Sequence, residues 1–260
     1  MLLSLVLPTF NECGTIGELI ERIEATRTKL PVELAIVVVD DNSNDGTANI
    51  VKSLKNKYSN ISLIQRPSPS GLGSAYLEGF NFSMNALNAD FFGEMDSDLQ
   101  HPPETLIAMC NSLEKNYDVV LASRYIPGGS TGGFSLARKL VSKGANLLAR
   151  LFLRLPVKDA TTGFRVISAR SIRSLFDYDL SAKGYAFQVE SLYVYKKCGM
   201  TFSEVPFAFG ARKVGETKLN SKEIFRFAAT TIKTGIFGLK KSRATLLSID
   251  ANQSKPELRN

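Results

Sequence analysis

The sequence predicts an α/β fold in which a mostly parallel sheet is covered by helices on both faces. Short apolar segments rich in β-branched residues alternate with longer segments of helical periodicity through the first two-thirds of the chain, as is typical of such sheets. Polar side chains directly follow several of the apolar segments. Because ligands bind at the carboxyl ends of the strands in open α/β sheets, this placement predicts a binding site along that edge.

Strands and helices are expected to alternate from the N-terminus. The predicted strands are Ser4–Pro8, Leu34–Val39, Ile61–Gln65, Phe91–Met95 and Asp118–Ser123. The predicted helices begin near Thr15 and Thr47 and span Gly71–Leu87 and Glu104–Lys115. The segment Thr15-Ile16-Gly17-Glu18 has the capping-box pattern, in which the Thr side chain accepts a hydrogen bond from the first turn. We expect residues 1–243 to form one domain and the polar residues 244–260 to be disordered.

Composition limits the class of protein. No apolar run reaches the ~20 residues that a membrane-spanning helix needs. The N-terminus lacks the basic region of a signal peptide, and the three cysteines have no paired spacing, so a cytoplasmic protein with reduced thiols is expected. The single histidine, His101, lies in a Gln-His-Pro-Pro turn. We expect it to be structural, and a Ser-His-Asp hydrolase with an independent histidine is excluded.

The two halves of the chain carry opposite charge. Residues 1–137 hold 9 Lys and Arg against 16 Asp and Glu, a balance of −7, whereas residues 138–260 hold 23 against 9, a balance of +14. The acidic half suits a metal site, and the basic half should attract an anionic substrate or a membrane surface. A nucleic-acid partner is not expected, because the basic residues alternate with aliphatic rather than aromatic side chains and no nucleic-acid motif is present.

Two aspartates, Asp96 and Asp98, directly follow the predicted strand Phe91–Met95. Aspartate is a poor strand residue and neighbouring carboxylates repel each other, so the pair indicates a bound cation. Oxygen ligands suit Mg²⁺ or Mn²⁺, which are commonly shared with substrate phosphates. An ordinary turn at a strand end is the alternative. The cation site is favoured because three further polar clusters are expected at the same edge: Pro8–Glu12, Asp40–Ser43 and Ser123–Tyr125.

These motifs resemble glycosyltransferase family 2. Residues 8–12, 38–47 and 95–103 are similar to segments shared across that family, whose members have the nucleotide-diphospho-sugar transferase (GT-A) fold. Residues 122–125, 138–146, 159–165, 183–190 and 205–219 resemble its dolichol- and polyprenol-phosphate mannosyltransferase branch. The resemblance covers about residues 3–240. It implies a three-layer α/β/α GT-A fold with C-terminal amphipathic helices.

The resemblance also implies an activity, the inverting, metal-dependent transfer of a hexose to a polyprenyl or dolichyl phosphate. Mannose from GDP-mannose is the preferred interpretation of the donor, and the product would be a β-linked sugar-phosphate lipid. A family 2 enzyme that uses UDP-glucose or another donor, or a glycan acceptor that is not a lipid, stays open as the alternative.

Roles for individual residues follow from the resemblance. The donor's base and ribose positions are Pro8, Phe10, Glu12, Val39 and Asp41. The metal and diphosphate positions are Asp96, Asp98 and Gln100, and Lys218 is a further donor-binding position. The acceptor-phosphate positions are Arg124, Arg138 and Ser142, and Arg212 belongs to a loop that closes over the site. The implied catalytic set is Asp98, Arg124, Arg138, Ser142 and Arg212. Phe10 stands where a tyrosine is common, so the stacking ring is kept without its hydroxyl.

The residues themselves are suited to this chemistry. An acceptor phosphate is already an anion near neutral pH, so it needs positioning rather than a strong base. The guanidinium groups of Arg124 and Arg138 can pair bidentately with phosphate.

Two basic amphipathic segments, Arg138–Leu155 and Ser221–Lys241, combine apolar side chains with lysines and arginines. Each fits a helix lying in a membrane interface, and each fits equally well a helix that packs on the core with a solvated basic face. The first interpretation predicts peripheral association with the cytosolic face of a membrane, with a small membrane-anchoring protein as a possible partner.

Overall fold

The computed structural model describes residues 1–113, 115–180, 184–210 and 221–242. The first nine elements alternate as predicted: β1 (Leu2–Thr9), α1 (Ile16–Arg27), β2 (Glu33–Asp40), α2 (Thr47–Lys57), β3 (Ile61–Gln65), α3 (Leu72–Asn85), β4 (Phe91–Glu94), α4 (Thr105–Leu113) and β5 (Val119–Ser123). They are followed by α5 (Leu136–Leu153), β6 (Arg165–Ser168), α6 (Ala169–Leu175), α7 (Phe187–Lys197), β7 (Phe202–Pro206) and α8 (Ser221–Phe237). Elements β6, α6, α7 and β7 were not predicted from the sequence.

The sheet has seven strands in the order β3-β2-β1-β4-β6-β5-β7. Strand β1 pairs in parallel with β2 and β4, β2 with β3, and β5 with β7. Strand β6 runs antiparallel to both of its neighbours, β4 and β5. The predicted α/β fold with a mostly parallel sheet is therefore confirmed, with one inverted strand near its centre.

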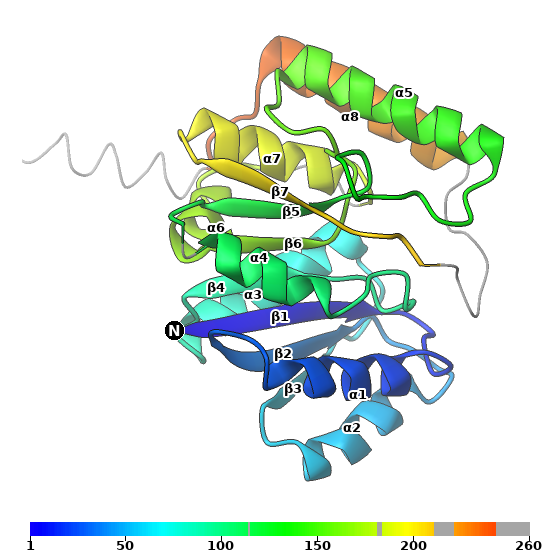
Figure 1. Ribbon diagram of the computed structural model, residues 1–260, viewed down its shortest axis with the longest axis vertical. Coiled ribbons are helices and arrows are strands. Elements are labelled where there is room, and N and C mark those ends of the chain that lie inside the picture. The colour runs from blue at the N-terminus through cyan, green and yellow to red at the C-terminus, as the bar shows by residue number, and fades with distance from the viewer. Residues whose placement is uncertain (114, 181–183, 211–220, 243–260) are drawn as a thin grey trace, which may run out of the picture.

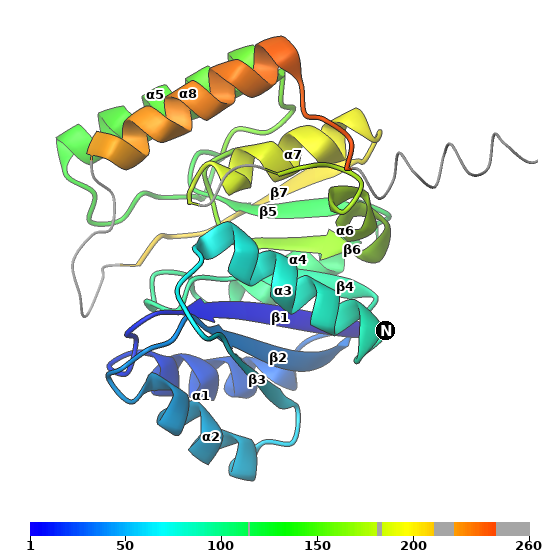
Figure 2. The same ribbon diagram turned by 180° about the vertical axis from the view of Figure 1, so that it is seen from behind.

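Helices cover both faces of the sheet, which explains why the strands are almost continuously apolar. Helices α1, α2 and α4 lie on one face (Figure 1), and α3, α6 and α7 lie on the other (Figure 2). Helices α5 and α8 pack side by side beyond α7, at one end of the molecule in both views. A Cβ atom on Gly235 of α8 would stand 2.7 Å from the carbonyl oxygen of Phe152 in α5, so the glycine allows these helices to approach closely.

The predicted capping box of α1 is wrong in its hydrogen bonds, although the helix starts where expected. Thr15 is the N-cap residue, but its side chain makes no bond to the first turn. Its hydroxyl instead donates to the carbonyl oxygen of Glu12 at 3.2 Å and to the carboxylate of Glu12 at 3.3 Å. The start of α1 thereby holds the loop after β1, which contributes to the site described below.

A buried carboxylate, Asp118, fastens the sheet at the edge where β5 begins. Arg170 in α6 donates to both of its oxygens. Thr201, just before β7, donates its backbone N–H at 2.9 Å and its hydroxyl at 2.8 Å to the same carboxylate. Burial alone would raise the pKa of Asp118, but these hydrogen bonds outweigh it and lower the pKa from 3.8 to about 2.

This depressed pKa makes a pH-dependent contribution to stability. We expect Asp118→Asn to lower the free energy of unfolding by about 2 kcal/mol at pH 7. The folded carboxyl resists protonation, so its contribution is complete above pH 4 and is lost as the pH falls from 4 towards 2. Urea unfolding of both proteins between pH 7 and pH 3 should show the difference narrowing below pH 4. A difference in the free energy of unfolding that stays constant over this range would contradict the lowered pKa of Asp118. Glu33→Gln, at an exposed position, is the control.

Candidate active site

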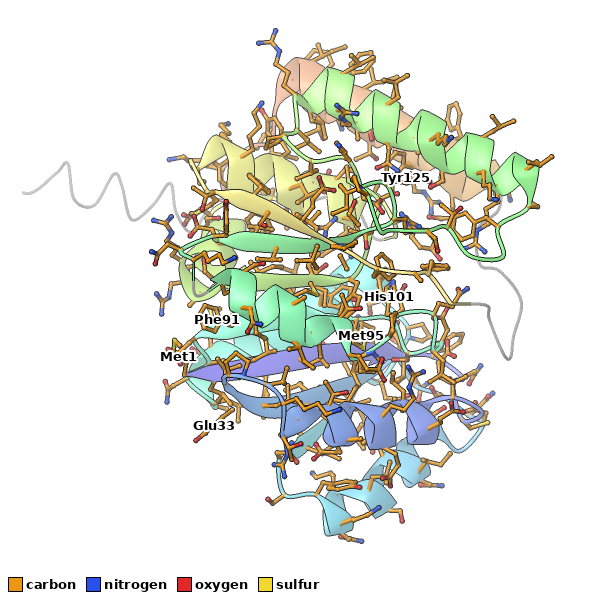
Figure 3. All side chains as sticks on the ribbon, viewed as in Figure 1. Met1, Glu33, Phe91, Met95, His101 and Tyr125 are labelled. Carbon is orange, nitrogen blue, oxygen red and sulfur yellow. The ribbon has the colours of Figure 1, made fainter. Side chains whose placement is uncertain are left out.

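The predicted polar clusters converge at one edge of the sheet. Met1, Glu33 and Phe91 mark the edge where β1, β2 and β4 begin, and Met95, His101 and Tyr125 lie towards the opposite edge (Figure 3). A cavity of about 590 Å³ opens there. Six of the residues singled out from the sequence line it together: Pro8, Phe10, Glu12, Asp41, Asp96 and Asp98.

A second, smaller cavity of about 120 Å³ adjoins the first and lies against α5 and α8. Arg124, Arg138 and Ser142, the three residues expected at an acceptor phosphate, all line it, together with Phe134 and Thr161. The structure therefore brings the predicted residues together in two groups, an acidic group in the larger cavity and a basic group in the smaller one.

The adjacent aspartates at the end of β2 have different contacts. Asp40, the last residue of β2, is fully buried, and its carboxylate accepts hydrogen bonds from the hydroxyls of Thr9 (2.8 Å) and Ser43 (2.6 Å), which ties the end of β1 to the loop after β2. Asp41 lines the cavity. Its carboxylate accepts the N–H groups of Ser70 and Gly71 at 3.2–3.3 Å and lies 3.3 Å from Nε of Arg66.

The turn that carries Asp96 and Asp98 is tightly held. Leu99 has a φ of +65°, an uncommon conformation for a bulky residue. One oxygen of Asp98 accepts the N–H of Gln100 at 3.1 Å, and the N–H of Asp96 donates to Nδ1 of His101 at 3.1 Å. A strained backbone conformation such as that of Leu99 persists only where the surrounding contacts enforce it.

His101 supports this turn from within the core. Its ring stacks on Phe164 with a centroid separation of 5.1 Å and meets Phe207 and Phe209 edge-on. Burial lowers its pKa to about 4, so the imidazole is neutral at pH 7. It is absent from the lining of both cavities, in keeping with the structural role expected from the sequence.

Asp96 and Asp98 form a donor set that fits a Mg²⁺ or Mn²⁺ ion. Within the described ranges no group of three or more His, Cys, Asp or Glu side chains could hold a metal. A magnesium ion that binds together with a substrate phosphate needs only one or two protein carboxylates, because phosphate oxygens and water complete its coordination shell. Both carboxylates line the cavity where a diphosphate would lie.

Two other predicted residues are not part of the cavity wall. Val39 is fully buried in the apolar layer under α3, where it lies close to Gly79. Gln100 is also buried, and its amide donates to the carbonyl oxygen of Gly210 at 3.0 Å. The structure therefore gives Gln100 a role in holding the chain at Gly210. Arg212 and Lys218 lie outside the described residues.

Arg124 is held in place by Asp159, which is fully buried. Nε and Nη2 of the guanidinium each donate to the carboxylate at 2.7 Å, and the Arg124 backbone N–H donates to it at 2.9 Å. Burial opposes the charge of Arg124, but the hydrogen bonds that its guanidinium donates to Asp159 prevail and raise its pKa. Arg124 is thus a permanent cation with a fixed orientation.

The other two residues of this group lie on α5. The guanidinium carbon of Arg138 is 3.9 Å from the centroid of the Phe134 ring, a cation–π contact. The hydroxyls of Ser142 and Tyr125 are 2.7 Å apart. Because Arg138 and Ser142 are four residues apart on one helix, both face the same cavity.

Several cavity residues were not identified as site residues from the sequence. The larger cavity is also lined by Pro69–Leu72, Gly184, Tyr185, Glu223 and Arg226. Tyr185 belongs to the segment 183–190 that carried part of the resemblance, which could have marked it. Glu223 and Arg226 lie in the segment Ser221–Lys241, which was predicted only as a helix in a membrane interface or against the core. Glu223 is the single acidic residue of this basic segment, and that could have marked it.

Comparison with solved structures defines the fold class as that of the nucleotide-sugar transferases with a GT-A-like fold. Mannosyl-3-phosphoglycerate synthase from Rubrobacter xylanophilus superposes with a TM-score of 0.64 and 20% identity over 100% of this chain and 77% of that protein. Glucosyl-3-phosphoglycerate synthase from Mycobacterium tuberculosis, solved with Mn²⁺, UDP and glucosyl-3-phosphoglycerate, gives a TM-score of 0.64 and 20% identity over 90% of this chain and 79% of that one. The predicted GT-A fold is confirmed.

The sequence then defines the family. The model of "Glycosyl transferase family 2" matches residues 4–176, and the chain belongs to this family. Dolichol-phosphate mannosyltransferase from Pyrococcus furiosus is 35% identical over 229 residues, which cover 87% of this chain and 62% of that protein. Undecaprenyl-phosphate mannosyltransferase from Micrococcus luteus is 32% identical over 215 residues, 83% of this chain and 86% of that protein. The chain thus spans less than two-thirds of the length of the Pyrococcus relative.

Proposed function

We propose that the protein transfers a hexose, mannose from GDP-mannose in the first place, to a polyprenyl or dolichyl phosphate, with inversion and with Mg²⁺ or Mn²⁺. The observation that carries this proposal is the pair of adjoining cavities, one lined by acidic strand-end residues and the other by two arginines. The relatives named as prenyl-phosphate mannosyltransferases support both the acceptor and the sugar.

The larger cavity is the proposed donor site. Phe10 is 42% exposed at this cavity and offers a ring on which a base can stack. Asp96 and Asp98 would hold the metal together with the diphosphate. When bound, that ion would stabilise the negative charge of the departing nucleoside diphosphate. The Mn²⁺ and UDP bound to the Mycobacterium enzyme of the same fold support a divalent metal here.

The smaller cavity is the proposed acceptor site. Arg124 and Arg138 can bind a phosphate monoester and hold one of its oxygens in line with the bond that breaks. The phosphate is ionised near neutral pH and attacks without a general base. In-line attack on an α-linked donor would give a β-linked product.

The proposed membrane association rests on the exposed faces of α5 and α8. Large apolar side chains stand in solvent on both helices, among them Leu140 (72% exposed), Leu147 (56%), Phe225 (76%) and Phe237 (79%). Most of the large apolar side chains of α5 are therefore exposed, although Ala149 and Leu153 pack in the core. This exposure supports the interfacial interpretation. No helix in the described part of the chain combines the length and apolar character needed to cross a bilayer. We propose that the two helices lie in the interface on the cytosolic face of a membrane.

A transfer assay tests the reaction. Wild-type protein receives GDP-mannose, UDP-glucose or UDP-GlcNAc with a short polyprenyl phosphate, in Mn²⁺ or in EDTA, and glycosyl-phosphoryl lipid is measured. We expect metal-dependent product from GDP-mannose, and at least about a 10³-fold loss in Asp98→Ala because the metal contribution is removed. Thermal unfolding checks that the variant is folded. Near-full activity of folded Asp98→Ala would refute the metal site, and lipid product from a UDP-sugar alone would refute the assignment of the donor.

Arg138→Ala should act mainly on the acceptor. We expect the KM for polyprenyl phosphate to rise by about 10- to 100-fold, the effect of losing a charged hydrogen-bonding group, with little change in the KM for the donor. Lys139→Ala, which removes the neighbouring cation on the same helix, is the matched control and should leave both constants nearly unchanged. If both substitutions raised the KM for polyprenyl phosphate equally, the loss of positive charge on α5 would explain the result, and the contact of Arg138 with the acceptor would be contradicted.

Vesicle sedimentation tests membrane association. Purified protein should bind vesicles that contain anionic lipid more tightly than neutral ones, because Lys and Arg near the surface add about 1 kcal/mol each. Leu140→Ser with Leu147→Ser should weaken binding without altering thermal unfolding, since both side chains are exposed. A protein that binds only after a membrane extract is added would instead support a separate anchoring partner.

A further inference from the structure

The two cavities adjoin each other at two side chains that line both of them. Among the residues that the structure describes, Tyr185 and Glu223 alone line both the acidic and the basic cavity. Tyr185 precedes α7, and Glu223 lies in the first turn of α8. These elements are far apart in sequence, so the shared wall exists only in the folded protein.

The position of this wall matters for the reaction proposed above. The bond from the sugar's C1 to the diphosphate oxygen breaks, its electron pair leaves with the nucleoside diphosphate, and a phosphate oxygen of the acceptor forms the new bond to C1. C1 must therefore lie within reach of both cavities. The hexose ring attached to it has to lie at their junction, against the residues that both cavities share.

The Glu223 carboxylate is fixed at this junction. It forms an ion pair with Arg226 one turn further along α8, and its side chain is 20% exposed. Gly184 makes room for it, because a Cβ atom at that position would stand 2.5 Å from Oε2 of Glu223. Arg226 lines the donor cavity but not the acceptor cavity, so the cation of this pair lies on the donor side of the junction.

We propose that the Glu223 carboxylate accepts hydrogen bonds from hydroxyl groups of the hexose and thereby selects the donor sugar, with the ring of Tyr185 packing against the same sugar. This inference rests on the proposed function. An ionised carboxylate accepts several O–H hydrogen bonds and is a stronger acceptor than a neutral group. A site built for such a bond disfavours an analogue that lacks the hydroxyl, because the charge-assisted hydrogen bond is then lost. The role is binding rather than proton transfer, since the acceptor phosphate is already ionised.

The experiment pairs variants of Glu223 with deoxy analogues of the donor. Wild type, Glu223→Gln and Glu223→Ala are given GDP-mannose and its 2-, 3-, 4- and 6-deoxy analogues. The wild type should disfavour at least one analogue by about 10- to 100-fold in kcat/KM. With GDP-mannose itself, kcat/KM of the variants should be lower than that of the wild type by about the same factor. Replacing GDP-mannose by that analogue should then lower kcat/KM of the variants almost no further. Affinity for GDP alone, measured by calorimetry, should stay unchanged.

Two further variants make the result specific. Gly184→Ala should reproduce the loss of discrimination, because its methyl group displaces the carboxylate. Glu33→Gln makes the same carboxylate-to-amide change as Glu223→Gln at the far edge of the sheet and should behave as the wild type. Glu223→Gln keeps the size of the side chain, so it serves if Glu223→Ala does not fold.

The outcomes separate this inference from the proposed function. Equal losses in the Glu223 variants for the parent donor and for every analogue would overturn the role in sugar selection. If the wild type gives no lipid product, the proposed acceptor fails. The same panel is then measured by hydrolysis of the donor, where retained discrimination by the wild type and its loss in Glu223→Gln would still support the sugar contact.

Discussion

The basic cavity depends on the buried pair of Arg124 and Asp159. A fully buried carboxylate is stable only when it is paired and hydrogen-bonded, and breaking such a pair typically costs about 3–5 kcal/mol. Asp159 also donates its N–H to Glu204 of β7 at 3.0 Å. Two residues on, Thr161 exchanges hydrogen bonds with Asn146 of α5 at 3.1 and 3.2 Å. The segment 159–161 is thus bonded to the end of β5 through the ion pair, and to β7 and α5 through these hydrogen bonds, which together hold the basic cavity.

A second buried pair lies next to the acidic cavity. Arg165 of β6 and Glu94 of β4 are both fully buried, with Nε and Oε2 separated by 3.9 Å. Burial raises the pKa of Glu94, and the charge of Arg165 acts against this effect. The two residues meet because β6 runs antiparallel to β4, so that its first residue pairs with the last residue of β4. The inverted strand therefore brings a cation to the buried carboxylate at the end of β4.

The sequence predicted the regions where local pattern decides structure and missed those where distant contacts do. Strand β3 was predicted with its observed bounds because its apolar residues and turn signals are local. Strand β6 is four residues long and owes its direction to its neighbours, which no local pattern encodes. Within the site, Asp41 faces the cavity whereas Val39 turns into the core. Side chains two residues apart share one face of a strand, so alternation does not separate these two residues. Val39 lies within β2 beneath α3, whereas Asp41 lies one residue beyond the end of β2, at the cavity.

The arrangement of charge follows from the nature of both proposed substrates, which are anions that must approach each other. Placing a diphosphate and a phosphate in one cavity would set two like charges close together at a large electrostatic cost. In the proposed arrangement the acidic wall would admit a diphosphate only together with a cation, and the arginine wall would bind the acceptor phosphate directly. The neutral sugar would separate the two anions. A lone carboxylate at that boundary would repel both, and the ion pair of Glu223 with Arg226 reduces this repulsion while leaving an oxygen acceptor at the junction. The boundary can therefore be polar enough to recognise hydroxyl groups without opposing the approach of either substrate.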